Sequence, residues 1–167
     1  MSDRPKSVVN EAELEWAGHR QGAFEIRRKQ LGAAAGGQKL GCSLVELPPG
    51  KRAWPLHYHL ANEEAIYVLA GEGVLRLGET ETQVRSGDYV ALPVGADHAH
   101  QLINRGGAPL RYLVFSTMIE PEVMFYPDSQ KVGVMAGAAP GGSKTARTLN
   151  AYLPDTRVDY WEGEPES

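Results

Sequence analysis

The chain has 167 residues, which suits one domain with a hydrophobic core and is fewer than two domains usually need. Apolar residues make up 42% of it, which excludes a chain that is disordered throughout. The formal net charge is −4 and the lysines and arginines are scattered, so the concentrated basic face that binds nucleic acid is not expected. The single cysteine, Cys42, cannot form an intrachain disulfide.

The beginning of the chain, MSDRPKSVVNEAELEW, lacks the apolar core of a signal peptide. The sequence also lacks a run of about 18 apolar residues, the length that spans a bilayer. We therefore expect a soluble cytoplasmic protein without a membrane partner.

The predicted elements are mostly strands. Residues 1–22 are polar and should form an N-terminal arm, with a short helix around 11–17. Apolar and β-branched runs bounded by Gly, Pro and Asn predict strands at 24–31, 40–47, 64–70, 73–78, 82–93 (divided by a Ser-Gly-Asp turn), 98–104 and 110–118, with edge strands at 122–126 and 131–135. Strands of this length without a strong helical period between them indicate an antiparallel sandwich or barrel.

The last predicted segment, residues 137–167, begins glycine-rich and then becomes polar. Its aromatic residues Tyr152, Tyr160 and Trp161 are too few to form a core, and aromatic side chains are costly to leave in water. We expect this irregular tail to pack on the barrel or on a second subunit. The chain thus divides into an arm (1–22), a barrel (23–136) and a tail (137–167).

The chemistry of the chain is concentrated around the segment HYHLANEE. His57 and His59 are two residues apart, so in a strand they project from the same face. Glu63 and Glu64 follow a short turn, and the next strand can bring a glutamate back beside the two imidazoles. Two imidazoles and a carboxylate form part of a divalent metal site, and His98, which follows a Pro-Val-Gly turn, is the candidate for a third imidazole.

This segment resembles the first cupin motif, G(x)5–6HxH(x)3–4E(x)6G. The matching positions are Gly50, His57, His59, Glu64 and Gly71. The resemblance implies an all-β fold, the double-stranded β-helix or cupin jelly-roll barrel, with a metal at its open end. Glu64 is preferred to Glu63 as a ligand because it alone is separated from Gly71 by the six residues of the motif.

A second stretch resembles the second cupin motif, G(x)5PxG(x)2H(x)3N. The matching positions are Gly87, Pro93, Gly95 and His98. The closing asparagine departs from the motif, because Leu102 stands there and Asn104 comes two residues later. The family's ligands therefore carry over onto His57, His59, Glu64 and His98. The cofactor would be a divalent ion, and Zn, Mn, Fe or Ni suits these ligands equally.

Two residues are candidates for catalytic proton transfer, Glu63 and His100. His100 should share the face of His98, because the two are two residues apart, and it would contact the substrate, shuttle a proton or hydrogen-bond a ligand. Lys51, Arg52 and Arg111 flank the predicted mouth, either as anion-binding groups or as ordinary surface charges. His19 is expected to be solvated in the arm.

Three functions fit this pattern. The segments FYPDSQKVGV and DYWEGE resemble small bacterial single-domain cupins described as sugar-phosphate isomerases, which implies a metal-dependent isomerase acting on a small polar or anionic substrate. The same ligands serve an Fe- or Mn-dependent dioxygenase or decarboxylase, and a non-enzymatic cupin that binds a small molecule is the third alternative. Barrels of this family commonly pair through sheet edges, so a homodimer is expected.

Overall fold

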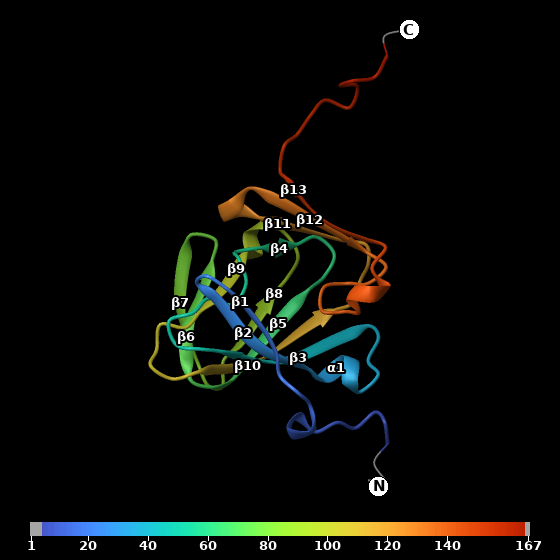
Figure 1. Cartoon of the computed structure of the whole chain (residues 1–167). Coiled ribbons are helices and arrows are strands. Elements are labelled where there is room, and N and C mark those ends of the chain that lie inside the picture. Colours follow the sequence, from blue (N-terminus) through green and yellow to red (C-terminus); the bar gives the residue numbers. More distant parts are fainter. Residues whose placement is uncertain (1–4, 166–167) are drawn as a thin grey trace.

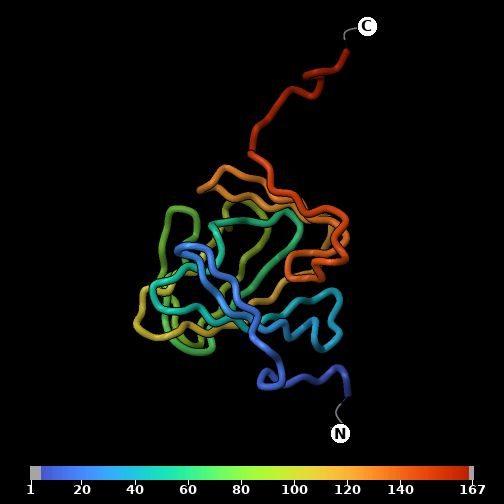
Figure 2. Tube along the Cα trace, in the orientation of Figure 1, coloured from blue at the N-terminus to red at the C-terminus, as the bar shows by residue number. Residues whose placement is uncertain are grey.

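The computed structural model describes residues 5–165 and consists mainly of β-strands joined by short turns (Figures 1 and 2). The largest of its antiparallel sheets has the order β1 (Ala17–Gln21), β2 (Phe24–Gln30), β3 (Leu40–Leu47), β10 (Leu110–Thr117), β5 (Glu64–Ala70) and β8 (Tyr89–Leu92). A second sheet has the order β13 (Leu149–Pro154), β12 (Lys131–Ala136), β11 (Glu122–Tyr126) and β4 (Tyr58–His59). The third has the order β7 (Thr80–Arg85), β6 (Glu72–Leu77) and β9 (His100–Ile103).

The helical elements are short. They are the helix α1 (Leu31–Ala34) and the 3-10 turns η1 (Glu11–Glu13), η2 (Ala96–His98), η3 (Pro127–Ser129) and η4 (Lys144–Ala146). Among the described residues, no helix has the length and apolar character needed to cross a membrane.

The hydrophobic core lies on the inward faces of the strands. In β5, Ile66 and Val68 are buried whereas Tyr67 and Leu69 are exposed, which is the alternation of a strand with one face on a core. The inward residues of β3 and β10 complete this core, among them Val45, Leu47, Leu110 and Tyr112. The all-β antiparallel fold expected from the sequence is confirmed.

Several strands coincide with their predicted ranges. β3, β5 and β11 have the predicted bounds, and the Ser-Gly-Asp turn separates β7 from β8. The helix expected around 11–17 is only the 3-10 turn η1, because the chain becomes extended at Leu14 and pairs with β2 from Ala17.

The arm and the tail both contain strands that the sequence did not predict. β1 pairs with β2 although all of its residues are exposed, and β13 pairs with β12. The division of the chain at residues 23 and 136 stays a prediction, and strand pairing extends across both boundaries.

We propose that the chain forms a homodimer that covers the end of the tail. The tail beyond residue 155 extends away from the sheets (Figures 1 and 2). Tyr160 is 83% exposed and Trp161 is 70% exposed, and their ring centroids lie 4.8 Å apart. Burying a large apolar side chain is worth roughly 1.5–3 kcal/mol, so a partner that covers both rings would gain substantially.

Sedimentation velocity should therefore show a dimer, and the double substitution Tyr160→Ser with Trp161→Ser should raise its dissociation constant by at least about tenfold. Val8→Ser, which changes an exposed apolar side chain in the arm, is the matched control and should leave the dimer unchanged. A monomeric parent protein, or a double variant that dimerises like the parent, would contradict this proposal.

Candidate metal centre

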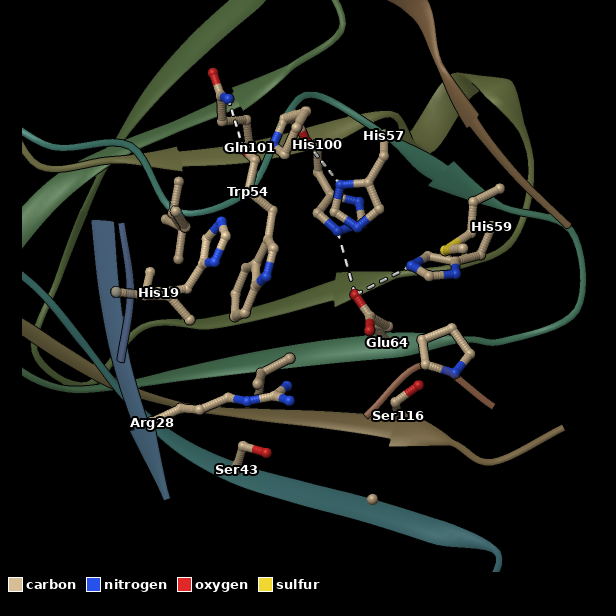
Figure 3. A pocket seen from close by; sticks show the side chains of 18 of the residues that line it. His19, Arg28, Ser43, Trp54, His57, His59, Glu64, His100, Gln101 and Ser116 are labelled. Atoms are coloured by element: carbon tan, nitrogen blue, oxygen red, sulfur yellow. Dashed lines mark hydrogen bonds and ion pairs between the residues drawn. The ribbon is translucent and has the colours of Figure 1, made fainter. Parts of the chain in front are cut away.

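Three imidazoles and one carboxylate meet inside a cavity of the molecule (Figure 3). They belong to His57, His59, Glu64 and His100, and one potential ligand atom from each lies within 4.8 Å of those of the others. His59 is on β4, Glu64 begins β5 and His100 begins β9. His57 precedes β4 and lies opposite His100, with which it exchanges both backbone hydrogen bonds at 3.2 and 2.8 Å. This pairing brings the two rings to 4.5 Å between centroids.

Each of the three imidazoles has its Nδ1 atom next to an oxygen that can only accept a hydrogen bond. Nδ1 of His57 lies 2.8 Å from the Pro55 carbonyl, Nδ1 of His100 lies 2.9 Å from the His98 carbonyl, and Nδ1 of His59 lies 3.1 Å from the Glu122 carboxylate. Nδ1 is therefore the donor in every case. In the neutral rings, the Nε2 lone pairs are left as ligands for a cation.

Burial and neighbouring charged groups shift the pKa values of two of the imidazoles and of Glu64. Burial, followed by the nearby His100 and His59, lowers the pKa of His57 to about 3, so this ring is neutral. Burial also lowers the pKa of His59, but the hydrogen bond from its Nδ1 to Glu122 and the nearby negative charge of Glu64 outweigh it and raise the pKa to about 9. For Glu64, burial opposes ionisation, but His100 and His59 more than compensate and hold its pKa well below its usual range.

A divalent cation fits this donor set. Nε2 of His59 is buried and makes no hydrogen bond within residues 5–165, because the nearest Glu64 oxygen is 3.6 Å away, too far for one. A buried nitrogen without a partner, beside a carboxylate and two further imidazoles, has the surroundings of a metal ligand. The cation would take the place of the proton that His59 otherwise holds. The ligand types do not distinguish Zn, Mn, Fe and Ni.

A buried carboxylate that the sequence analysis missed supports His59 from behind. Glu122 is 0% exposed, at the start of β11. Besides Nδ1 of His59, it accepts hydrogen bonds from the backbone N–H groups of Leu60, Ala61 and Asn62, at 3.3, 3.1 and 3.1 Å. It therefore fixes both a candidate ligand and the turn that leads from β4 to β5. The only signal in the sequence was an acidic residue at the head of the apolar run EVMFY.

The structure places His100, not His98, in the fourth position of the group. The expectation for both residues assumed one continuous strand, but His98 ends the 3-10 turn η2 and β9 begins only at His100. His98 contributes its backbone carbonyl to the Nδ1 atom of His100, and its own side chain stays outside the group. Asn104 was the overlooked signal, because it follows His100 at the spacing H(x)3N of the second motif.

The other predicted site residues also lie away from the group. Glu63 is exposed and does not line the cavity; its backbone N–H donates to the Thr117 hydroxyl at 3.0 Å. Lys51 and Arg111 form ion pairs with Glu25 and Glu11, at 3.5 and 2.9 Å. Neither they nor Arg52 lines the cavity.

The cavity that holds the group has a volume of about 610 Å³, the size of a small-molecule site. His19, expected to be solvated, is exposed and lines it. Tyr126 stacks on His57 with ring centroids 6.0 Å apart. The hydroxyl of Tyr112, also in the lining, is buried and has no hydrogen-bond partner among the residues that the structure describes. Burial raises its pKa, so it remains protonated and able to donate.

The cationic residues that line the cavity are not the predicted ones. They are Arg28, Lys131, Lys144 and Arg147. They come from β2, β12 and the segment around η4, which are far apart in the sequence, so no local motif could have indicated them.

Part of the sequence matches the model of a known domain family. Residues 43–116 match the family model of the cupin domain. Cupincin from Oryza sativa subsp. japonica is 34% identical over 102 residues, which cover 56% of this chain and only 21% of cupincin. An uncharacterized protein of Methanocaldococcus jannaschii is 34% identical over 76 residues, which are 44% of this chain and 58% of that protein. The chain therefore spans about a fifth of the cupincins and little more than half of the archaeal relative.

Comparison with solved structures extends the similarity to most of the chain. A crystal structure from Acidithiobacillus ferrooxidans, named "putative sugar phosphate isomerase", has a TM-score of 0.78 and 26% identity over 92% of this chain and 96% of that one. A structure from Silicibacter pomeroyi, named as a cupin-superfamily sugar phosphate isomerase, has a TM-score of 0.75 and 24% identity over 96% of each chain, a likeness of fold. The domain match shows that the chain contains a cupin domain at residues 43–116, and the two structures show that its fold is shared over most of the chain.

Proposed function

We propose that the chain is a metal-dependent enzyme that isomerises a sugar phosphate, with a divalent cation held by His57, His59, Glu64 and His100. The observation that carries the metal is the convergence of three Nε2 atoms and one carboxylate oxygen while every Nδ1 is engaged elsewhere. The Acidithiobacillus ferrooxidans structure, similar over 92% of this chain, supports the isomerase. The four cationic side chains in the cavity lining support an anionic substrate.

His57, His59, Glu64 and His100 would hold a cation that supplies Lewis acidity at the substrate carbonyl, where polarisation makes the neighbouring C–H bond more acidic. The chain itself must then supply orientation and a proton-transfer group. The carbonyls of Pro55 and His98 and the carboxylate of Glu122 hold the rings in one tautomer, so the coordinating atoms are already in place. Preorganisation of this kind lowers the cost of ordering the site when the substrate binds.

Proton transfer between two carbons requires a group outside the ligand set. Glu63 does not line the cavity and His100 belongs to the proposed ligands, so the two candidates from the sequence do not suit this role. Of the two histidines outside the ligand set, His19 lines the cavity and His98 does not. An imidazole in the cavity can both accept and donate a proton, and we assign proton transfer to His19.

The test combines metal analysis with an activity assay. Protein purified without an affinity tag or chelator should contain about one divalent ion per chain by elemental mass spectrometry, and should interconvert an aldose phosphate and a ketose phosphate, followed by NMR. Chelation should abolish the interconversion. His19→Gln should lower kcat by about 100-fold or more with the metal retained, because general acid–base catalysis contributes at least that much. Glu63→Gln is the matched control and should behave like the parent.

Two outcomes would overturn this function. Protein that holds no metal even after reconstitution would leave the histidines as part of a binding pocket. Near-stoichiometric iron with dioxygen consumption, and no activity on sugar phosphates, would favour the dioxygenase alternative instead.

A further inference from the structure

Two arginines from separate parts of the sequence line the same cavity. Arg28 is on β2, and Arg147 directly follows η4. Both are half-buried. Figure 3 shows the Arg28 side chain extending from β2 into the cavity, on the other side from His57, His59 and His100. Burial, followed by the positive charge of Arg147, lowers the pKa of Arg28, so the two guanidinium groups are near enough to repel each other.

Neither guanidinium group is neutralised within residues 5–165. Arg28 makes no hydrogen bond or ion pair there. In the described part of the chain, Arg147 has only two long contacts, from Nη1 to the Asn150 side chain at 3.4 Å and from Nη2 to the Ala139 carbonyl at 3.3 Å. Its Nε atom is buried there without a partner. The neighbouring Arg27 differs, because it is exposed and paired with Glu46.

Positively charged side chains predominate in the cavity lining, whereas the whole chain has a negative net charge. Within the described residues, the lining contains four arginines and lysines, namely Arg28, Lys131, Lys144 and Arg147, and one acidic residue, Glu64. The chain as a whole carries a formal charge of −4. Lys131 and Lys144 are exposed, whereas Arg28 and Arg147 are half-buried. Partly desolvated like charges without counter-ions are costly, and an anion bound to the two arginines would reduce that cost.

We propose that Arg28 and Arg147 form a subsite for the phosphoryl group of the substrate, on the wall of the cavity that faces the candidate metal centre. Guanidinium groups present paired N–H donors that match two phosphate oxygens, and a dianionic phosphoryl group can engage both arginines at once. This inference rests on the proposed function and extends it by assigning the group that anchors the substrate. The reacting end of the molecule would then lie toward the three histidines.

The first experiment titrates the full-length protein, as purified, with inorganic phosphate at constant ionic strength in a calorimeter. The parent should bind phosphate at least about tenfold more tightly than acetate, since a dianion can pair with both guanidinium groups. Arg28→Gln and Arg147→Gln should each weaken phosphate binding by at least about tenfold. Arg27→Gln removes the same charge from the same strand and should change it less than about twofold. Arg28→Lys keeps the charge without the planar fork and should bind with intermediate affinity.

A second measurement separates binding from a structural role. Removing one of two repelling charges should leave the melting temperature of Arg28→Gln equal to or above that of the parent. Saturating phosphate should raise the melting temperature of the parent but not that of the variant, because only a folded state that binds the anion is stabilised by it. A variant that melts well below the parent without phosphate would show that Arg28 is a structural residue and would overturn the subsite.

The subsite and the proposed function can fail independently. His100→Ala should lose metal but keep phosphate binding. If phosphate binding is lost in His100→Ala and unchanged in Arg28→Gln, phosphate sits on the metal and the arginine subsite is refuted, while the metal enzyme survives. A parent protein that binds phosphate no better than acetate, or no better than the two glutamine variants, also refutes the subsite.

Discussion

Replacing His100 with alanine should strip the protein of most of its metal, whereas replacing His98 with alanine should leave the metal in place. His100 supplies one of the four converging ligand atoms, and its Nε2 atom lies 3.3 Å from the Glu64 carboxylate. Losing only the hydrogen-bond partner of a ligand costs about 10–100-fold in metal affinity, so we expect loss of the ligand itself to exceed about 100-fold. His98 contributes only its backbone carbonyl, which alanine retains.

Elemental mass spectrometry of the two purified variants, followed by competition titration with a chromophoric chelator, measures this difference. The pair is well matched, since each variant removes one imidazole from the same short segment. Circular dichroism should show the parental strand content in both. Full metal occupancy in His100→Ala together with loss from His98→Ala would restore the ligand set that the sequence motif indicated.

The exchange of His98 for His100 shows where a sequence motif stops being informative. The spacing of His57, His59 and Glu64 depends on one short strand and one turn, so local pattern was sufficient to predict that they come together. The fourth residue depends on how the chain passes from Gly95 into β9, and η2 occupies that passage. The motif spacing G(x)2H, applied from Gly95, therefore reaches His98, two residues before the histidine of the group. The spacing H(x)3N, applied backwards from Asn104, reaches His100.

Buried hydrogen bonds fix the position of Asn104, and so its spacing from His100. It is 0% exposed, and its side-chain amide donates to the carbonyls of Leu47 and Ala108, at 2.8 and 2.9 Å. Its side-chain oxygen accepts from the Gly106 N–H at 2.9 Å. The residue thus fixes the end of β9, and with it the register that turns the His100 side chain toward the other imidazoles.

Burial explains which strands could be predicted. The apolar runs of β3, β5 and β11 end at turn-forming residues and have inward faces that pack in the core or the cavity, so their pattern is visible in the sequence. All residues of β1 are exposed and β4 has two residues, so neither leaves a hydrophobic pattern. β13 is held mainly by its pairing with β12, and such long-range pairing has no local signature.

Replacing Glu122 with glutamine should lower both the stability of the fold and the affinity for metal. One oxygen of the carboxylate accepts from the N–H groups of Leu60, Ala61 and Val123, and the other accepts from Nδ1 of His59 and from both the backbone and side-chain amides of Asn62. Glutamine replaces one of these oxygens with an NH2 group, which cannot accept. Whichever way the amide lies, several buried donors lose their acceptor, at a cost of about 1–3 kcal/mol each.

The expected loss of unfolding free energy is about 3–5 kcal/mol, comparable to that of breaking a buried ion pair. For a chain of this length that corresponds to a fall in Tm of roughly 6–20 °C. Metal affinity should fall by about 10–100-fold, because His59 loses the group that orients it. Thermal unfolding followed by circular dichroism and the chelator competition measure the two effects. Glu120→Gln, an exposed glutamate two residues earlier, is the control and should stay within about 0.5 kcal/mol of the parent.

The two losses should appear together because one carboxylate serves both purposes. Glu122 holds His59 at the end of β4 and also the turn at 60–62 that delivers Glu64 at the start of β5. The distance between two candidate ligands is thus set by a residue on a third strand, β11. If Glu122→Gln lost metal affinity at the parental Tm, Glu122 would orient His59 without holding the turn. If it lost stability alone, the ligand geometry would be fixed by the pairing of β4 with β11 instead.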